Sequence, residues 1–371
     1  MDSHRPFDPK PPSSCGECSL LAECGGLEGE AFSVGCFQRC TAQCQFGWCD
    51  MVCPCLHLNF AELIEEVGGL CHPPQRELIP CALNDLPFYV PHVEHGSRRS
   101  EALAERVVSV PLTALVGMNR GGRYVVRYDT PEAMRDGLRI SRDTAVVVSS
   151  VAPDRYIEDF WAWHERNDTL AHLASLRLCA MTVPNYSFMT DVPRPNSLYN
   201  LTRIFRVAER ISASGIPTVL HLQASNRRDW SRWGSVLRDQ PQSRHVALEF
   251  QTGARRRETG DKYFFGLVEL QNELSRPLHP IVMAGGFRIR DFAGHFDAFT
   301  IADSTPFIKT MKRKILLHST NGGWRSYPTE HHECLNHLLA QNVTVHRARM
   351  LHRGGLAHPL TRQRLLLPPA A

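Results

Sequence analysis

Eight short apolar runs, separated by stretches with helical spacing, constrain the fold of this chain more than any other feature. They lie at 88–93, 107–113, 144–151, 176–184, 217–224, 245–252, 279–285 and 298–302. Continuous apolar runs of this length are typical of parallel strands that are buried on both faces. The intervening segments predict amphipathic helices at 154–173, 194–214, 227–240 and 261–276.

Eight strands that alternate with helices predict an α/β protein with a (β/α)8 TIM-like barrel. Such a barrel needs about 250 residues, and the region 85–320 supplies that length. An open doubly wound sheet is the alternative, but no GxGxxG or Walker motif supports its usual nucleotide ligands. A small hairpin is expected within 117–143, where Gly121 and Gly122 precede alternating Tyr and Val residues.

Cysteine is concentrated before the barrel. Eleven of the 13 cysteines fall within residues 1–81. In a reducing compartment such a cluster favours a metal site over disulfides. Zinc and an iron–sulfur cluster stay equal alternatives, since Cys15-x2-Cys18 suits zinc and Cys49-x3-Cys53-Pro54 suits a cluster. The candidate ligands are Cys15, Cys18, Cys24, Cys36, Cys40, Cys44, Cys49, Cys53 and Cys55.

Charge divides the chain at the same place. Residues 1–84 carry four basic and eleven acidic side chains, whereas the remainder carries 38 basic and 27 acidic ones, a net of +11. The larger part therefore favours a polyanionic partner, although a solvated basic surface is the alternative. We expect three parts: a Cys-rich metal-binding module (1–84), a catalytic barrel (85–320) and a helical extension (321–371).

The chain shows no targeting or membrane feature. No apolar run approaches the ~20 residues of a membrane-spanning helix. The first thirty residues also lack the basic start and apolar stretch of a signal peptide. A cytoplasmic protein without a membrane partner is expected.

Polar residues follow the predicted strands, at the end where barrel enzymes carry their chemistry. Carboxylates and amides around one mouth suit a nucleophile or an acid/base group together with groups that read a polar heterocycle. Asp154 and Asp191 could equally be helix caps, and His221 could be a core histidine. The candidates are Asp154, Asn185, Tyr186, Asp191, His221, Gln223, Glu249, Gln251, Gly285, Gly286 and Asp303.

Several of these segments, in chain order, resemble one enzyme family. Residues 88–91 (Phe-Tyr-Val-Pro) precede a glycine at 96, residues 222–224 read Leu-Gln-Ala, and residues 281–286 end in Gly-Gly. Asp303-Ser304 and a late helical segment at 338–350 follow. This order resembles the tRNA-guanine transglycosylases, and most of all their relatives that insert 7-deazaguanine bases into DNA.

The resemblance implies base exchange at a nucleoside, with guanine replaced by a 7-deazaguanine base. Asp303 would be the nucleophile that attacks C1′. Asp191, with Asp154 as second choice, would manage protons, and the substrate base would lie among Asn185, Tyr186, His221, Gln223, Glu249, Gln251, Gly285 and Gly286. Nucleic acid, with DNA favoured over tRNA, would contact Arg255, Arg256, Arg257, Lys309, Lys312 and Arg313. No nucleotide cofactor is expected, and accessory proteins are a further expectation.

The chain also departs from that family. Its Asp-Ser-Gly-Gly-Phe acid/base motif is absent after the third strand, and so are the three cysteines and histidine of its zinc site. Only Cys334 with His331, His332 and His337 occurs in that region, and an exposed helix is expected there. Two alternatives therefore stay open: a nucleic-acid-binding protein with an inactive barrel, and a metal-cluster redox or lyase enzyme.

Overall fold

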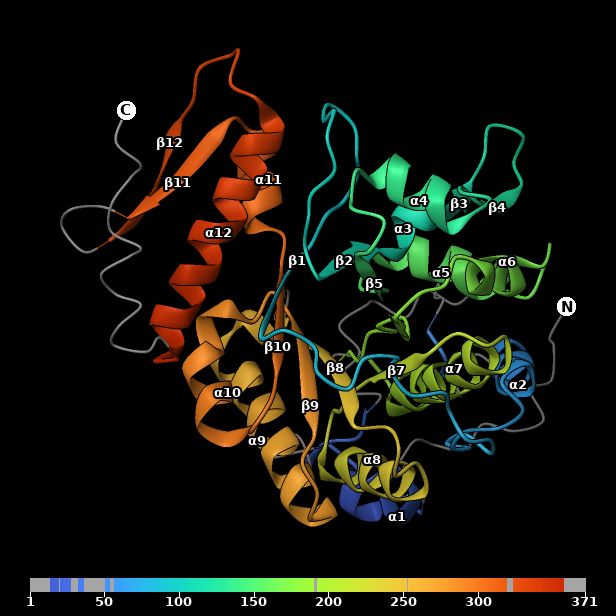
Figure 1. Ribbon diagram of the computed structural model, residues 1–371. Helices are drawn as coiled ribbons and strands as arrows, with labels where there is room; N and C mark the ends of the chain where they lie inside the picture. The colour runs from blue at the N-terminus through green and yellow to red at the C-terminus, as the bar shows by residue number, and fades with distance from the viewer. Residues whose placement is uncertain are drawn as a thin grey trace, which may run out of the picture.

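The computed structural model describes residues 14–19, 21–27, 33–36, 51–53, 57–189, 192–251, 253–318 and 323–356. Its centre is a sheet of eight parallel strands in the order β1-β10-β9-β8-β7-β6-β5-β2 (Figure 1). All eight predicted strands are confirmed. They are β1 (Tyr89–Pro91), β2 (Val107–Pro111), β5 (Ala145–Ser149), β6 (Ala180–Thr182), β7 (Thr218–His221), β8 (His245–Glu249), β9 (His279–Met283) and β10 (Thr300–Asp303).

The two end strands of this sheet approach each other. An isolated parallel bridge joins His92 to Ser109, and the Val93 N–H donates a 2.8 Å hydrogen bond to the Ser109 carbonyl. The sheet is therefore a nearly closed barrel, as the alternation of apolar runs and helices predicts.

One small side chain from each strand fills the barrel interior. These residues form one buried cluster and are Val90, Val107, Val147, Ala180, Val219, Ala247, Ile281 and Ala302. Cys81 and Leu86 join the same cluster, so the segment that precedes β1 also contributes to the interior. Larger side chains such as Phe205, Trp233 and Phe264 form the layer between the strands and the outer helices.

The outer layer consists of α5 (Asp154–Trp163), α6 (Thr169–Ser175), α7 (Arg194–Ala213), α8 (Arg227–Asp239), α9 (Arg257–Leu274), α10 (Ile289–His295) and α11 (Thr305–Met311). The single helix predicted at 154–173 is two helices. Asn167 and Asp168 separate them with φ angles of 56° and 53°. This left-handed backbone interrupts the helix, and Asn and Asp are among the residues that tolerate it.

Several short elements follow the carboxyl ends of the strands. The expected hairpin is confirmed as the antiparallel pair β3 (Val116–Met118) and β4 (Tyr124–Val126). The other short elements are α3 (Leu112–Leu115), α4 (Pro131–Leu138), η4 (Gly253–Arg255) and η5 (Gly286–Arg288).

The chain after the barrel packs back onto it. A hairpin of β11 (Lys314–His318) and β12 (Trp324–Pro328) precedes the long helix α12 (Leu335–Gly354). Figure 1 shows α12, in red, beside α11 and β11, near the paired strands β1 and β10. This position brings one face of α12 to the rim of the barrel.

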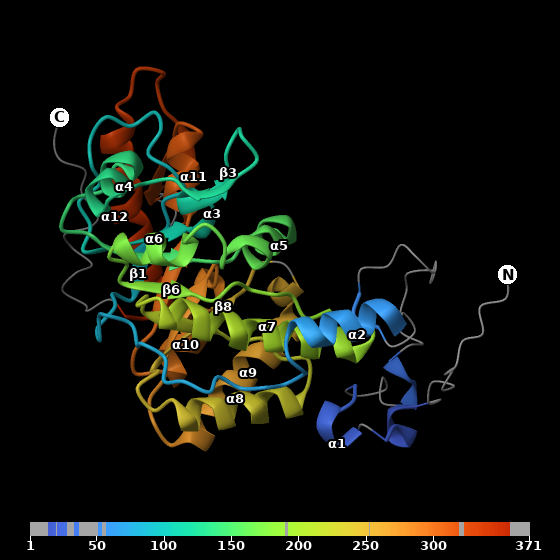
Figure 2. The same ribbon diagram turned by 90° about the vertical axis from the view of Figure 1, so that its right-hand side faces the viewer.

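The described parts of the N-terminal region lie against α7 and α8. They include η1 (Cys15–Glu17), α1 (Leu21–Cys24) and α2 (His57–Glu66). Figures 1 and 2 both show α2 beside α7 and α1 beside α8. Glu66 accepts hydrogen bonds from Trp161 Nε1 at 2.6 Å and the Tyr199 hydroxyl at 2.7 Å. No helix among the described residues is long and apolar enough to cross a membrane.

Candidate active site at the mouth of the barrel

Asp303 ends β10, the last strand of the barrel, with its carboxylate at the rim. The Thr305 N–H donates a 2.7 Å hydrogen bond to Oδ1, and His346 Nε2 of α12 lies 3.2 Å from Oδ2. The backbone carbonyl of Asp303 accepts a 3.1 Å hydrogen bond from the N–H of His92, the residue that follows β1. This bond extends the pairing of β10 with β1 to the rim. The side chain is 14% exposed, so a small area stays open to a ligand.

The surroundings of Asp303 keep its carboxylate ionised. Burial alone would raise the pKa, but the hydrogen bond and charge of His346 and the Thr305 hydrogen bonds outweigh it and lower the pKa to about 2. At neutral pH Asp303 is therefore an anion, the form in which a carboxylate acts as a nucleophile.

Two further aromatic side chains, those of His92 and Tyr89, lie near this carboxylate. Burial lowers the pKa of His92 to about 4, and its Nδ1 lies 3.0 Å from Ser109 Oγ. Burial also raises the pKa of Tyr89 well above its ordinary value, and its ring packs edge-on against His346 at 5.6 Å. His92 is thus neutral at pH 7, and His346 is the imidazole that contacts Asp303.

Gly286 leaves space beside the carboxylate. A Cβ at this position would lie 3.5 Å from Asp303 Oδ2 and 3.0 Å from Met350 Sδ. Any side chain would therefore fill the approach to Oδ2. The preceding residue, Gly285, is required for a different reason. A Cβ there would lie 2.2 Å from Val282 Cγ1 of β9, so a side chain at this position would clash.

Glu249 is the second carboxyl group of the mouth. It ends β8, and burial raises its pKa, while an Asn185 hydrogen bond lowers it and the charge of Asp154 raises it. Asn185 Oδ1 accepts a 3.2 Å hydrogen bond from the Ala152 N–H, and Asp154 Oδ1 accepts one of 3.5 Å from Ser187. The structure thus brings three predicted site residues together. Glu249 is the one whose pKa moves towards neutral pH.

Gln223 follows β7, and a side-chain hydrogen bond connects it to α9. Its Oε1 accepts a 2.9 Å hydrogen bond from the Tyr263 hydroxyl, and its carbonyl accepts one of 2.8 Å from Trp233 Nε1. The Gln223 side-chain amide nitrogen remains available to a ligand. Tyr263 was not among the sequence candidates.

The two carboxyl groups lie at the same height of the barrel. Glu249 pairs with Met283 of β9, and Met283 pairs with Ala302, the residue before Asp303. Two strand spacings separate them, which amounts to roughly 10 Å. This spacing refers to the backbone, because Glu249 shares the interior face of Ala247 whereas Asp303, next to Ala302, faces α12.

The remaining predicted base-site residues fall elsewhere. His221 is fully buried, and burial lowers its pKa to about 3. It lies two residues after Val219 on the same strand, so it shares the face of Val219 that points into the barrel interior. Tyr186 is buried in the outer core, with the Arg203 guanidinium 4.0 Å from its ring centre. Gln251 is exposed, and Asp191 lies outside the described residues.

The predicted nucleic-acid contacts lie in segments that follow β8 and β10. Arg255, Arg256 and Arg257 are exposed, the last with 95% of its side chain accessible. Lys312 is exposed as well. Lys309 donates a 3.3 Å hydrogen bond to Ser326 Oγ, and Arg313 donates to the Glu330 and Glu333 carbonyls.

Four of the predicted metal ligands lie in one region, but among the described residues no three of their sulfur atoms come within 4.8 Å of one another. Burial raises the pKa of Cys36, and the charges of Cys24, Cys15 and Cys18 raise it further, so these three thiols lie within electrostatic range. The Cys18 N–H donates a 3.1 Å hydrogen bond to the Cys15 carbonyl, which closes a tight turn between the pair. Four sulfur ligands suit zinc or an iron–sulfur cluster. Cys53 is also buried, whereas Cys40, Cys44, Cys49 and Cys55 lie outside the described residues.

A second group of metal-binding side chains lies on the surface. The ligand atoms of Glu101, Cys334 and His337 are all within 4.8 Å of one another, and all three residues are exposed. The sequence predicts only an exposed helix here. Glu101 precedes β2, far from Cys334 in the chain, so no local pattern indicates it.

Comparison with known proteins adds no relative. The chain matches no protein-family model and no curated protein. The site itself must therefore carry any conclusion about function.

Proposed function

We propose that this chain exchanges a base in nucleic acid, with Asp303 as the nucleophile. The observation that supports this most is the ionised Asp303 carboxylate, held by Thr305 and His346 at the rim, with Gly286, which has no side chain, beside Oδ2. Buried carboxylates without such partners are protonated more readily and are poorer nucleophiles.

The reaction proceeds in two displacement steps. In the first, Asp303 attacks C1′ of a guanosine residue, the C1′–N9 bond breaks, and its electron pair leaves with the guanine. Glu249, whose pKa burial raises, donates a proton to the departing base. In the second, N9 of a 7-deazaguanine base attacks C1′, the ester bond to Asp303 breaks, and Glu249 takes up the proton.

The base would be held by groups on the Glu249 side of the mouth. Asn185 and Glu249 present amide and carboxyl groups, and Gln223 presents its amide nitrogen. In a duplex the target nucleotide would first have to leave the stack, at a cost of about a few kcal/mol.

Incorporation of labelled guanine tests this proposal. The protein is incubated with single-stranded DNA, duplex DNA or tRNA in parallel, and radioactivity retained in the polymer is measured. We expect incorporation into DNA that an unlabelled 7-deazaguanine base competes away. Asp303→Asn should abolish it, whereas Asp129→Asn, at a site 96% exposed, should not. Retained exchange in a folded Asp303→Asn protein would exclude Asp303 as the nucleophile.

A further inference from the structure

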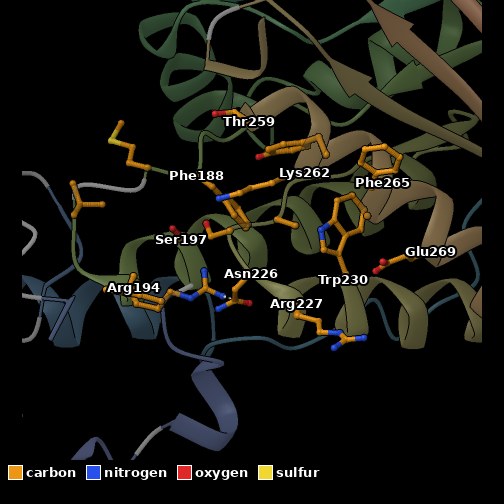
Figure 3. Close-up of a pocket in the computed structure, with 17 residues that line it drawn as sticks. Phe188, Arg194, Ser197, Asn226, Arg227, Trp230, Thr259, Lys262, Phe265 and Glu269 are labelled. Atoms are coloured by element: carbon orange, nitrogen blue, oxygen red, sulfur yellow. Dashed lines mark hydrogen bonds between the residues drawn. The ribbon is translucent and has the colours of Figure 1, made fainter. Parts of the chain in front are cut away.

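A cavity of about 500 Å³ lies beside the mouth, between α7, α8 and α9 (Figure 3). Four aromatic rings line it, those of Phe188, Trp230, Tyr263 and Phe265, together with the cationic side chains of Arg227 and Lys262. Its volume falls within the range of about 300–1,000 Å³ that is typical of ligand pockets. None of these residues has a role in the proposed reaction.

The aromatic wall is held in place by close packing. A Cβ at Gly266 would lie 2.2 Å from Cε2 of Trp230, so the indole occupies space that only a glycine on α9 leaves. The same indole packs edge-on against Tyr263, with ring centres 6.3 Å apart. Phe265, by contrast, is 55% exposed, which is unusual for so large an apolar side chain.

The cavity also presents buried polar atoms that lack partners. Arg194 is 3% exposed, and its Nε and Nη1 atoms have no hydrogen-bond partner among the described residues. The same holds for Ser225 Oγ. Both side chains line the cavity, and buried polar groups are normally satisfied. These atoms are themselves inaccessible, and the other end of Arg194 forms a buried ion pair with Asp229, so they belong to the wall of the cavity.

The cavity is connected to the mouth through Tyr263. Its ring lines the cavity, while its hydroxyl donates a 2.9 Å hydrogen bond to Gln223 Oε1. The charge of Glu249 also contributes to the raised pKa of Tyr263, after burial, so the two groups are close. A ligand in the cavity therefore lies next to a ligand in the mouth.

We infer that this cavity binds a nucleotide that neighbours the target in single-stranded nucleic acid. The base packs against Trp230 and Phe265, and the phosphate lies near Lys262 and Arg227. Aromatic rings bind any base through its π face, and cationic side chains follow the backbone. Glu269, also at the cavity, disfavours a phosphate at its own end and can accept a hydrogen bond from a base amino group. The inference rests on the proposed function for its partner, although binding can be measured without exchange.

Fluorescence of 2-aminopurine tests the inference. The probe is single-stranded DNA of ten nucleotides, with one guanine and 2-aminopurine beside it. We expect binding to quench the fluorophore, because it stacks on the aromatic wall. Phe265→Ala should weaken binding by about tenfold or more and reduce the quenching. Phe265 is exposed, so its replacement should leave the fold intact.

Two further variants sharpen the test. Trp230→Ala should act like Phe265→Ala, whereas Tyr327→Ala, an exposed aromatic residue of β12, should bind like the parent. An abasic residue in place of the fluorophore should weaken binding to the parent and have little further effect on Phe265→Ala. Equal affinity of the parent and both cavity variants for the intact probe would overturn the inference.

Failure of this inference and failure of the proposed function give different results. If the cavity variants bind normally while Asp303→Asn loses exchange, only the cavity is misassigned. If the cavity variants lose binding while no exchange is detected with any polymer, the nucleotide site stands and the proposed reaction falls.

Discussion

His346 Nε2 lies 3.2 Å from Oδ2 of Asp303, across the contact between α12 and the last barrel strand. The other ring nitrogen of His346 has no hydrogen-bond partner among the described residues. Beside the hydrogen bonds from Thr305, the pKa of Asp303 is therefore lowered by an imidazole supplied by a helix that follows the barrel.

Replacement of His346 should shift the acid limb of the pH–rate profile. His346 lowers the pKa of Asp303, so His346→Ala should raise that pKa and reduce exchange at mildly acidic pH more than at pH 7. His352→Ala, an exposed histidine on the same helix, is the matched control. A profile that keeps its shape in His346→Ala would show that the imidazole does not control the carboxylate.

Asp303 should also contribute to stability in a pH-dependent way. Its pKa falls from 3.8 to about 2 on folding, so its contribution is fully present above pH 3.8 and is lost as the pH falls towards 2. The shift corresponds to about 2 kcal/mol. Denaturant unfolding of Asp303→Asn at pH 7 should show a loss of that order, and the gap to the parent should narrow below pH 4. A constant gap would contradict the linkage.

The contribution of Glu249 to stability should depend on pH in the opposite direction. Burial raises its pKa above the ordinary 4.5, so its protonated form is favoured in the folded protein and its contribution to stability is lost as the pH rises through the folded pKa. Thermal melts of Glu249→Gln should therefore improve relative to the parent between pH 4 and pH 7.

The same variant tests the chemistry of Glu249. Glu249→Gln should slow exchange by about 10²-fold or more, because the amide cannot carry the proton. An unaltered rate would move the acid/base role to another group.

The exposed arginines after β8 should contact phosphates. Replacing Arg255, Arg256 and Arg257 together by glutamine should weaken binding to single strands of any sequence. The salt dependence should also flatten, by about two in the log–log slope, since each contact contributes about 0.7. Arg238→Gln, at the end of α8 in an ion pair with Glu273, is the control. An unchanged slope would place the arginines outside the interface.

The clustered thiols should hold a metal. Elemental analysis of anaerobically purified protein should find zinc or iron, and a brown colour would identify an iron–sulfur cluster. Replacing Cys15 and Cys18 by serine should remove the metal. Loss of metal from Cys334→Ser instead would assign it to the surface group with Glu101 and His337.

The strands could be predicted because each is buried on both faces and so appears as an apolar run. Val107–Pro111 and His279–Met283 show this, with nearly every residue buried. The hairpin of β11 and β12 was missed because β12 is mostly exposed, and a strand without an apolar run resembles a loop in the sequence. The break at Asn167 and Asp168 depends on local backbone geometry that the apolar pattern does not encode.

The candidate site could be predicted only in part. Asp303 and Glu249 end apolar strands, so their places at the mouth follow from the strands themselves. His346 lies on a separate helix, and no local pattern indicates which of its residues reaches the barrel. The aromatic cavity depends on Gly266 and Trp230, which belong to different helices and meet only in the folded protein.

The pairing of β1 with β10 determines when the candidate site can form during folding. Asp303 is the last residue of β10, opposite Pro91 of β1, and these are the first and last strands of the barrel. Contacts between such distant parts of a chain form slowly, because a long loop must close before they are gained. During synthesis Asp303 and its contact His346 leave the ribosome after every other strand of the barrel. A nascent or truncated chain that ends before them would therefore hold most of the barrel strands but not the Asp303 carboxylate.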